Sequence, residues 1–227
     1  MSYLGSKAAS GAYQAIIAKM PPHDTYIETH LGSGAVMLRK PKAAHSIGID
    51  LDTSVIESFK KSDEVELHSM DAVAFLKDFD YSAAGRVLIY ADPPYLHSTR
   101  TSRTRYKKEY TDDNHKALLS VLIDLSKNGI AVMLSGYPSP LYDELLPDWK
   151  TLEFQVMSRG GVRTEKLWMN FESTAAHWAT FAGADFTDRQ RIKRKAKRWA
   201  EKYKALPASE RLAVLAALLE CEQTQHS

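Results

Sequence analysis

The sequence predicts an α/β fold built around a mostly parallel β-sheet. Short apolar, β-branched runs alternate with helical patterns from residue 25 onward, and regular alternation of this kind is typical of parallel sheets covered by helices. The composition, 44% hydrophobic and 26% charged over 227 residues, is that of a globular chain with a sizeable core. The only cysteine is Cys221, so neither an intramolecular disulfide nor a thiolate zinc site can form, which suits a reducing compartment.

Seven segments have the composition of strands, and helical patterns precede the first and follow most of the others. The strand candidates are residues 25–29, 46–50, 66–69, 87–91, 130–135, 152–157 and 167–171. The helix candidates are residues 6–19, 35–39, 53–61, 72–77, 112–127 and 140–146. Ser54, Asp71 and Asp112 stand where helix N-caps are expected.

The composition changes after residue 171, which predicts three parts: a catalytic domain at 1–172, a linker or covering segment at 173–187 and a helical extension at 188–227. A basic helix is expected over 188–204, capped by Asp188. A second helix should begin at Pro207 and carry an apolar stripe of Leu212, Leu215 and Leu219. That stripe could pack within the chain or form a dimer seam, so the oligomeric state stays open.

Positive charge is concentrated in two segments. Residues 189–204 hold nine basic side chains and one acid, and residues 97–110 hold five and one. Because the whole chain carries only +2, the remainder is strongly acidic. Such asymmetry favours a polyanionic partner.

Four acids follow successive predicted strands. Glu28, Asp50, Asp71 and Asp92 each stand at or just past a strand end. The carboxyl ends of parallel strands meet at one edge of a sheet, where α/β proteins bind ligands. We therefore expect the four carboxylates to share one crevice.

The first three of these sites have a plain structural alternative. Gly32 and Gly34 follow Glu28 and could let a ligand approach a helix N-terminus, but taken alone they are better explained by a tight turn. Met37 stands where a dinucleotide fingerprint would need its third glycine, which disfavours a pyrophosphate site. Asp50 suits ribose hydroxyls, with an N-cap or a solvated acid as the alternative, and Asp52 is the better cap of the two. Asp71 suits an exocyclic amine, but taken alone it is better explained as a helix cap.

The fourth site, Asp92-Pro-Pro-Tyr95, is the most specific signal in the sequence. An apolar strand runs directly into it. Two prolines fix the backbone and remove two N–H donors, so nearby carbonyls are left as acceptors. Asp92 and the Pro93 carbonyl could both accept from one NH₂ group, while Tyr95 offers a flat face to a base.

These motifs resemble the DNA adenine methylase family of S-adenosylmethionine-dependent N6-adenine methyltransferases, over residues 3 to about 171. The family's opening segment is similar to Tyr3-Leu-Gly-Ser-Lys7, its glycine loop to residues 28–34, and its Asp-Pro-Pro-Tyr to residues 92–95. Residues 164–170 resemble the closing strand of amino-methyltransferases. The resemblance implies a Rossmann-like methyltransferase fold with a seven-stranded, mostly parallel sheet and a C-terminal basic helical extension.

The resemblance also implies roles for matching residues. The cofactor S-adenosylmethionine would be held, without a metal, by Tyr3, Lys7, Glu28, His30, Gly32, Gly34, Asp50 and Asp71. The catalytic group would be Asp92, Pro93, Pro94 and Tyr95, with Tyr95 stacking on a flipped adenine. His30 stands where the family usually has phenylalanine, which makes the wall of the cofactor pocket more polar.

The family's target-recognition insertion is missing, because Asp71 and Asp92 are only 21 positions apart. Other segments must then bind the nucleic acid, and we expect relaxed or very short sequence specificity. The candidate contacts are Arg100, Arg103, Arg105, Lys107, Lys108, Arg191, Arg194, Lys195 and Arg198. The alternatives are a solvated loop and a solvated helix docked by Trp199.

The sequence thus predicts a DNA adenine-N6 methyltransferase, site-specific or non-specific. RNA adenine-N6 methylation, DNA cytosine-N4 methylation and a non-catalytic nucleic-acid-binding protein stay open as alternatives, and a protein glutamine methyltransferase is disfavoured by Asp92. Ser135 and Tyr137 could line the base pocket or form a turn, and His115 and Asp112 are expected to be caps. With no leader pattern and no apolar run of about 20 residues, we expect a cytoplasmic protein that does not bind membranes.

Overall fold

A computed structural model describes residues 7–8, 11–59, 64–96, 110–158, 161–173, 177–183 and 185–223. The chain divides into two compact units, Met1–Phe181 and Ala182–Ser227. Each unit is described by itself below.

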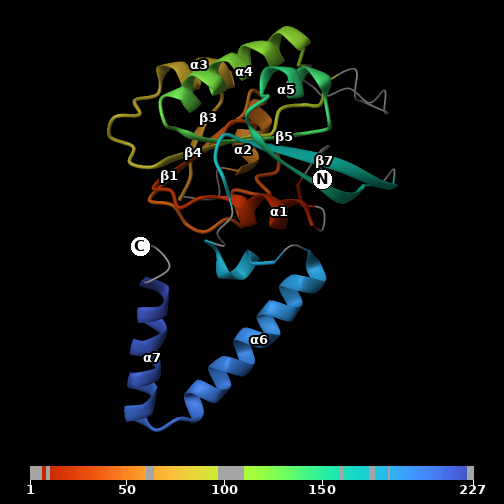
Figure 1. The fold of residues 1–227 in the computed structure, drawn as a ribbon. Helices are drawn as coiled ribbons and strands as arrows, with labels where there is room; N and C mark the ends of the chain where they lie inside the picture. Colours follow the sequence, from red (N-terminus) through yellow and green to blue (C-terminus); the bar gives the residue numbers. More distant parts are fainter. Residues whose placement is uncertain are drawn as a thin grey trace. The chain divides into compact units, whose positions relative to one another are not determined.

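The first unit is built on one seven-stranded sheet with the order β3-β2-β1-β4-β5-β7-β6 (Figure 1). Strands β1 to β5 run parallel, and β7 is antiparallel to both β5 and β6. This confirms the predicted mostly parallel, seven-stranded sheet. The strands are β1 (Thr25–Glu28), β2 (His45–Ile49), β3 (Glu66–His68), β4 (Val87–Ala91), β5 (Ala131–Gly136), β6 (Lys150–Ser158) and β7 (Gly161–Met169).

Helices cover both faces of this sheet, which gives three layers (Figure 1). The buried side chains of α3, α4 and α5 pack with Val87, Ile89 and Ala91 on one face of β4. Those of α1 and α2 pack with Leu88 and Tyr90 on the other. Because both faces are covered, β4 is buried along its whole length, as a central parallel strand should be. The helices are α1 (Ala12–Lys19), α2 (Thr53–Phe59), α3 (Ala72–Asp78), α4 (Asp112–Lys127) and α5 (Pro140–Leu145).

Several predicted local features are wrong in detail. Residues 35–39 form turns rather than a helix. At the start of α2 the Asp52 side chain accepts the Ser54 N–H, so the predicted cap at Asp52 is confirmed and the one at Ser54 is wrong. At α4 the N-cap is Thr111, whose hydroxyl accepts from the Asn114 N–H, so Asp112 is the first helical residue. Asp71 caps α3 as expected, accepting from the Ala74 N–H at 3.0 Å.

The strand order fixes where a ligand site should lie. From β1 the chain builds outward through β2 to β3, and it then returns to β4 on the other side of β1. In open α/β sheets the ligand crevice lies at the carboxyl ends of the strands, at such a reversal. Glu28 ends β1 and Asp92 follows β4, so both stand at this point of the sheet.

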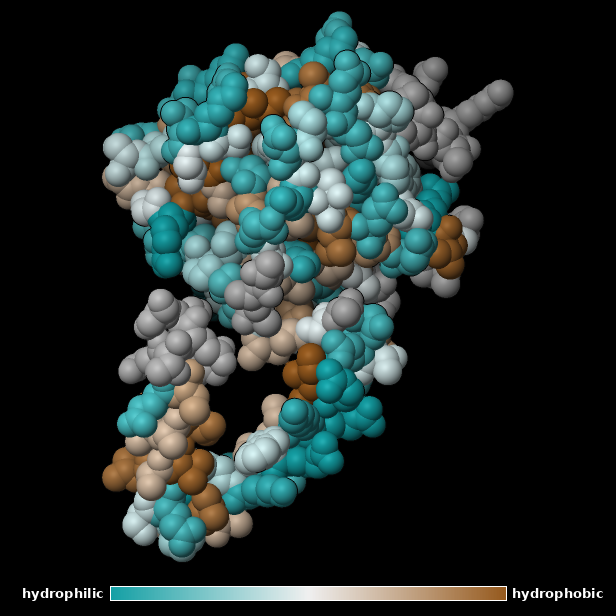
Figure 2. Space-filling view, viewed as in Figure 1, coloured by the Kyte–Doolittle hydropathy of each residue, from teal (hydrophilic) through white to brown (hydrophobic). Residues whose placement is uncertain are grey.

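The second unit consists of two long helices, α6 (Phe186–Ala205) and α7 (Ala208–Gln223). The cap of α6 is Asp185, which accepts from the Asp188 N–H at 2.8 Å, so the predicted cap at Asp188 is wrong. Figure 2 shows α6 as mostly hydrophilic and α7 as largely hydrophobic. On α7, Leu212, Leu215, Leu218 and Leu219 are exposed. Among the described residues, no helix has both the length and the apolar character to cross a membrane.

Candidate active site

Asp92 sits in a network of hydrogen bonds on one face of the sheet. The Lys7 ammonium donates to its Oδ1 at 2.6 Å, and the Ser135 hydroxyl donates to the same oxygen at 2.8 Å. Ser135 gives its one proton to Asp92, so the Tyr90 hydroxyl, 2.8 Å away, is the donor to Ser135. Tyr90 on β4 and Ser135 on β5 thus fix Asp92 from the two neighbouring strands.

The charges around Asp92 are strongly coupled. Burial raises the pKa of Asp92, against the opposing effect of the Lys7 ammonium. Burial acts to lower the pKa of Lys7, but Asp92 and its neighbours hold it well above the usual range. The Lys7 side chain is only 4% exposed and also lies 3.4 Å from Glu165 Oε2. One buried cation therefore serves two carboxylates.

Tyr95 is held at its hydroxyl and along its ring. The hydroxyl donates to Glu165 Oε1 at 2.9 Å, and Lys7 lies 3.4 Å from it. The ring stacks on Tyr137, with centroids 3.9 Å apart and 19° between the planes. Arg163 donates to the Tyr137 hydroxyl at 2.8 Å. The predicted stacking residue thus has one ring face covered by another tyrosine.

Glu28 is a buried carboxylate at the end of β1, 3% exposed. The Tyr26 hydroxyl donates to its Oε2 at 2.9 Å. Burial raises the pKa of Glu28 to about 8, and the charge of Asp92 adds to this. A carboxyl group in this state gains strongly from a cationic partner, so its chemistry fits the ammonium of an amino-acid ligand.

The glycine loop follows Glu28 and is tied to Asp50. Gly32 and Gly34 have φ of 49° and 60°, in the left-handed region that favours glycine. A Cβ on Gly34 would come within 2.2 Å of the Phe59 ring. The Gly32 N–H donates to Asp50 Oδ2 and the Asp52 N–H to Oδ1, each at 2.9 Å. A carboxylate has further lone pairs, so Asp50 can still accept from sugar hydroxyls.

His30 and Asp71 lie near Tyr110. Loss of solvent lowers the pKa of His30 to about 3, so its ring is neutral. The ring packs edge-on against Tyr110 at 5.5 Å. Burial raises the pKa of Tyr110, and the charge of Asp71 contributes. Asp71 is therefore close enough to act on the aromatic group that covers His30.

A cleft of about 860 Å³ opens beside the aromatic pair. Its lining includes Leu96, Lys116, Tyr137 and Arg163. A volume of this size is in the range of small-molecule sites. The cleft reaches the site through Tyr137, whose ring stacks on Tyr95, and its lining also includes the acid Asp112.

The structure places the Lys7 ammonium against both Asp92 and the Tyr95 hydroxyl, and it joins Gly32 to Asp50. It places Glu28 on the same face as Asp92, because Glu28 pairs with Tyr90 in the β1–β4 register. Tyr3 and the basic residues Arg100, Arg103, Arg105, Lys107 and Lys108 lie outside the described residues. His115 is not a cap but a buried side chain, 2.7 Å from the Tyr142 hydroxyl.

Sequence reasoning missed Glu165, Arg163 and Tyr90. Glu165 was hidden inside a segment chosen for its likeness to a closing strand. The available signal was an acid only two positions before the apolar run that begins at Leu167. An acid so close to a buried strand segment needs a partner, and such residues are often functional.

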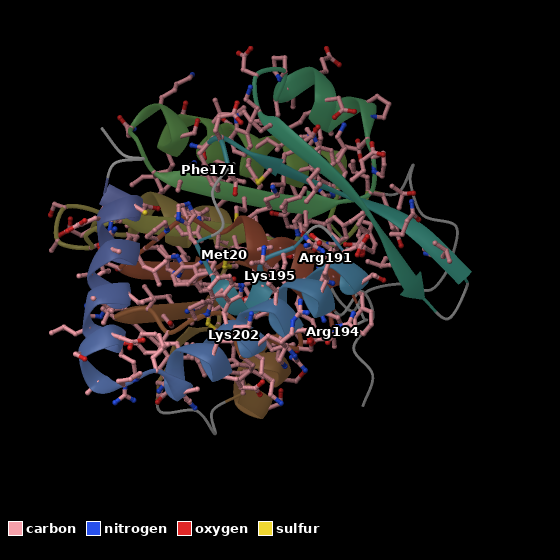
Figure 3. The ribbon with its side chains drawn as sticks, turned by 60° about the horizontal axis from the view of Figure 1, so that its bottom comes forward. Met20, Phe171, Arg191, Arg194, Lys195 and Lys202 are labelled. Atoms are coloured by element: carbon pink, nitrogen blue, oxygen red, sulfur yellow. The ribbon has the colours of Figure 1, made fainter. Side chains whose placement is uncertain are left out.

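Five basic side chains of α6 form a stripe, and further exposed lysines, Lys193, Lys197 and Lys204, lie on the opposite side of the helix. Arg191, Arg194, Lys195, Arg198 and Lys202 follow the helical repeat and are exposed. Figure 3 labels four of them along the helix. Arg191 is partly neutralised by Asp188, 2.7 Å away, so most of the stripe carries uncompensated charge.

A family model described as D12 class N6 adenine-specific DNA methyltransferase matches residues 58–164. This range is a little under half of the chain. It includes Asp71, Asp92–Tyr95 and Tyr137, and it ends one residue before Glu165. No curated protein sequence matches the chain.

Several solved structures are similar to this chain at low identity. A precorrin 8W decarboxylase from Methanobacterium thermoautotrophicum has 13% identity and a TM-score of 0.49, with 75% of this chain and 97% of that chain covered. A SAM-dependent methyltransferase from Agrobacterium tumefaciens has 13% identity and a TM-score of 0.45, with 69% of this chain and 58% of that chain covered. The O-methyltransferase TomG from Streptomyces achromogenes has 14% identity and a TM-score of 0.46, with 69% of this chain and 77% of that chain covered. Similarity at this level does not bear on activity.

The matched range contains Asp71, Asp92 and Tyr95, whereas Lys7, Glu28, Asp50 and Glu165 lie outside it. Over residues 58–164, the chain is similar to the D12 class of N6 adenine-specific DNA methyltransferases.

Proposed function

We propose that this protein is an S-adenosylmethionine-dependent DNA adenine-N6 methyltransferase. The observation that carries the proposal is the position of the Lys7 ammonium, 2.6 Å from Asp92 and 3.4 Å from the Tyr95 hydroxyl. An N–H donor already occupies the acceptor site beside the double-proline corner. The ammonium stands in for the exocyclic amine of a target base.

The residues around Asp92 can activate such an amine. The lone pair of adenine N6 is delocalised into the ring, so the nitrogen is a weak nucleophile. Acceptance of its two N–H bonds by Asp92 and the Pro93 carbonyl would favour a pyramidal nitrogen with its lone pair free. A fixed carboxylate also stabilises the positive charge that develops on nitrogen. S-adenosylmethionine, when bound, supplies an electrophilic methyl group on sulfur.

Lys7 must leave this position before a base can enter. Its ammonium and the amine compete for the same Asp92 oxygen, so only one can be bound at a time. A neutral base entering in place of a cation leaves Asp92 facing the reacting nitrogen with less compensation of its charge. The site is then most favourable when that nitrogen becomes positive, which is the transition state.

Glu28, Gly32, Gly34, Asp50 and Asp71 would hold the cofactor, with Tyr3, Lys7 and His30 as further candidates. The raised pKa of Glu28 makes this testable. Below pH 8 the free carboxyl is mostly protonated, and binding an ammonium requires it to lose that proton. Affinity for S-adenosylmethionine should therefore rise about tenfold per pH unit from pH 6 to 7.5, and fall again once the ligand's amine deprotonates near pH 8.

Calorimetry across this pH range measures the effect. Glu28→Gln should flatten the acid limb and weaken binding at pH 8. The exposed Glu153→Gln is the control and should change neither. An acid limb of equal slope in Glu28→Gln would show that Glu28 does not face the ammonium.

The α6 stripe is proposed to bind phosphates, together with the predicted contacts at residues 100–108. Changing Arg191, Arg194, Lys195 and Arg198 to alanine should weaken DNA binding by more than tenfold at 50 mM salt and reduce the salt slope by up to about 4. The matched control removes four exposed lysines of the other unit: Lys42, Lys77, Lys127 and Lys150. If both quadruple variants lose the same affinity, the effect is one of net charge and the stripe is not a binding site.

Labelled methyl transfer to DNA, RNA and protein tests the function as a whole. We expect label on DNA. Label on RNA alone would contradict the DNA substrate and indicate an RNA methyltransferase, and label on protein alone would contradict the proposal altogether.

A further inference from the structure

Strand β7 carries two charged side chains beside the proposed site, Arg163 and Glu165. They are two positions apart in one strand, so both point to the same face of the sheet. Each contacts the hydroxyl of a different tyrosine: Arg163 donates to Tyr137 and Glu165 accepts from Tyr95. One strand therefore holds both members of a stacked aromatic pair.

The contacts leave the pair little freedom. Tyr95 and Tyr137 stack at 3.9 Å with 19° between their planes. Each hydroxyl is fixed by a charge-assisted hydrogen bond of 2.8–2.9 Å, which is roughly twice as strong as a neutral one. A ring held both across its face and at its far end can neither tilt nor slide without losing a contact.

Glu165 has no other evident reason to be buried. It is 4% exposed, and burying a carboxylate is unfavourable unless its oxygens are satisfied. Oε1 accepts a hydrogen bond from the Tyr95 hydroxyl, whereas Oε2 accepts none from the described residues and is compensated among them only by the Lys7 ammonium 3.4 Å away. Both of these partners belong to the proposed site.

We propose that Glu165 is a positioning residue for the target base. By accepting the Tyr95 hydroxyl, it fixes the Tyr95 ring against Tyr137, so that the opposite ring face is presented to the base whose amine binds Asp92. The inference rests on the proposed methyltransferase function and adds to it a residue beyond the Asp-Pro-Pro-Tyr corner. Arg163 likewise fixes the Tyr137 ring by donating a hydrogen bond to its hydroxyl.

Steady-state transfer to DNA tests this role with a set of matched variants. Glu165→Ala should lower kcat about tenfold, the effect of one lost hydrogen bond, with affinity for S-adenosylmethionine within twofold of wild type. Glu165→Gln keeps a carbonyl acceptor and should recover most of the rate. Tyr95→Phe removes the same bond from its other end and should match Glu165→Ala. The exposed Glu153→Ala on β6 should behave as wild type.

The double variant Glu165→Ala/Tyr95→Phe separates positioning from a general structural effect. If Glu165 acts through the Tyr95 hydroxyl, the double variant is no slower than either single one. Multiplying losses, or a Glu165→Gln variant as slow as Glu165→Ala, would overturn the proposal. Thermal unfolding of each variant confirms that the fold is retained; should Glu165→Ala not fold, Tyr95→Phe and Glu165→Gln decide the matter.

A crystal structure of Glu165→Gln and of Tyr95→Phe gives a readout that does not depend on activity. We expect the ring at 95 to keep its stack on Tyr137 in Glu165→Gln and to shift in Tyr95→Phe. An unmoved ring in Tyr95→Phe would show that the bond to Glu165 does not position it. Wild-type protein that transfers no methyl group would instead refute the proposed function, and the two failures are therefore distinguishable.

Discussion

Replacing Asp92 with asparagine should lower the rate of methyl transfer by about 10²–10³-fold, the range seen when a preorganised electrostatic contact is removed. The amide has nearly the same shape, but it carries no charge to stabilise a positive nitrogen. One of its two positions is also a donor, which would repel the N–H bonds of the target amine. Affinity for S-adenosylmethionine should stay within about threefold, since none of the proposed cofactor contacts except Lys7 touches Asp92.

Single-turnover transfer with calorimetry of cofactor binding measures both quantities on one preparation. The exposed Asp148→Asn is the control and should match wild type. Ser135→Ala should give an intermediate loss, because it removes only one donor to Asp92 Oδ1. Full activity in Asp92→Asn would take Asp92 out of the mechanism.

Replacing Lys7 with methionine should lower the free energy of unfolding by about 3–5 kcal/mol at pH 7.5, the usual cost of removing one partner of a buried ion pair. Asp92 and Glu165 would then be buried together without a cation. The pKa of Lys7 is raised in the folded protein, so the wild-type contribution is present throughout the neutral range and disappears only when pH rises above about 10.5.

The free energy of unfolding that Lys7→Met loses should be smaller at lower pH. Without the ammonium, the pKa of Asp92 rises further, and the folded state then takes up a proton that the unfolded chain releases. Urea denaturation at pH 5 and pH 7.5 should therefore give a smaller loss at pH 5. The exposed Lys127→Met should leave stability unchanged at both. An equal loss at both pH values would contradict the proposed charge balance.

The acids at strand ends could be predicted from the sequence because the carboxyl ends of parallel strands lie at one edge of a sheet. Asp92 follows a strand that is apolar at every position, and Glu28 ends another, so any parallel arrangement brings both to one edge. The N-caps were less predictable. Asp185 and Asp188 are both good caps, and the choice depends on where the segment before the helix ends, which local sequence does not specify.

Glu165 and the aromatic stack could not be predicted from such rules. The β6–β7 hairpin is antiparallel and extends from Lys150 to Met169, whereas the apolar pattern shows only residues 152–157 and 167–171. The start of β7 lacks the apolar pattern of a buried strand because it borders the site rather than the core. Which tyrosine meets Glu165 then depends on the register of β7 against β5, a contact between segments far apart in sequence.

We propose that the protein methylates the exocyclic nitrogen of adenine in DNA. The most direct measurement is digestion to nucleosides of DNA incubated with the protein and labelled S-adenosylmethionine, followed by chromatographic identification of the labelled species. The account predicts that the label co-elutes with N6-methyl-2′-deoxyadenosine and is lost in Asp92→Asn. Label in N4-methyl-2′-deoxycytidine, or equal label from Asp92→Asn, would contradict it.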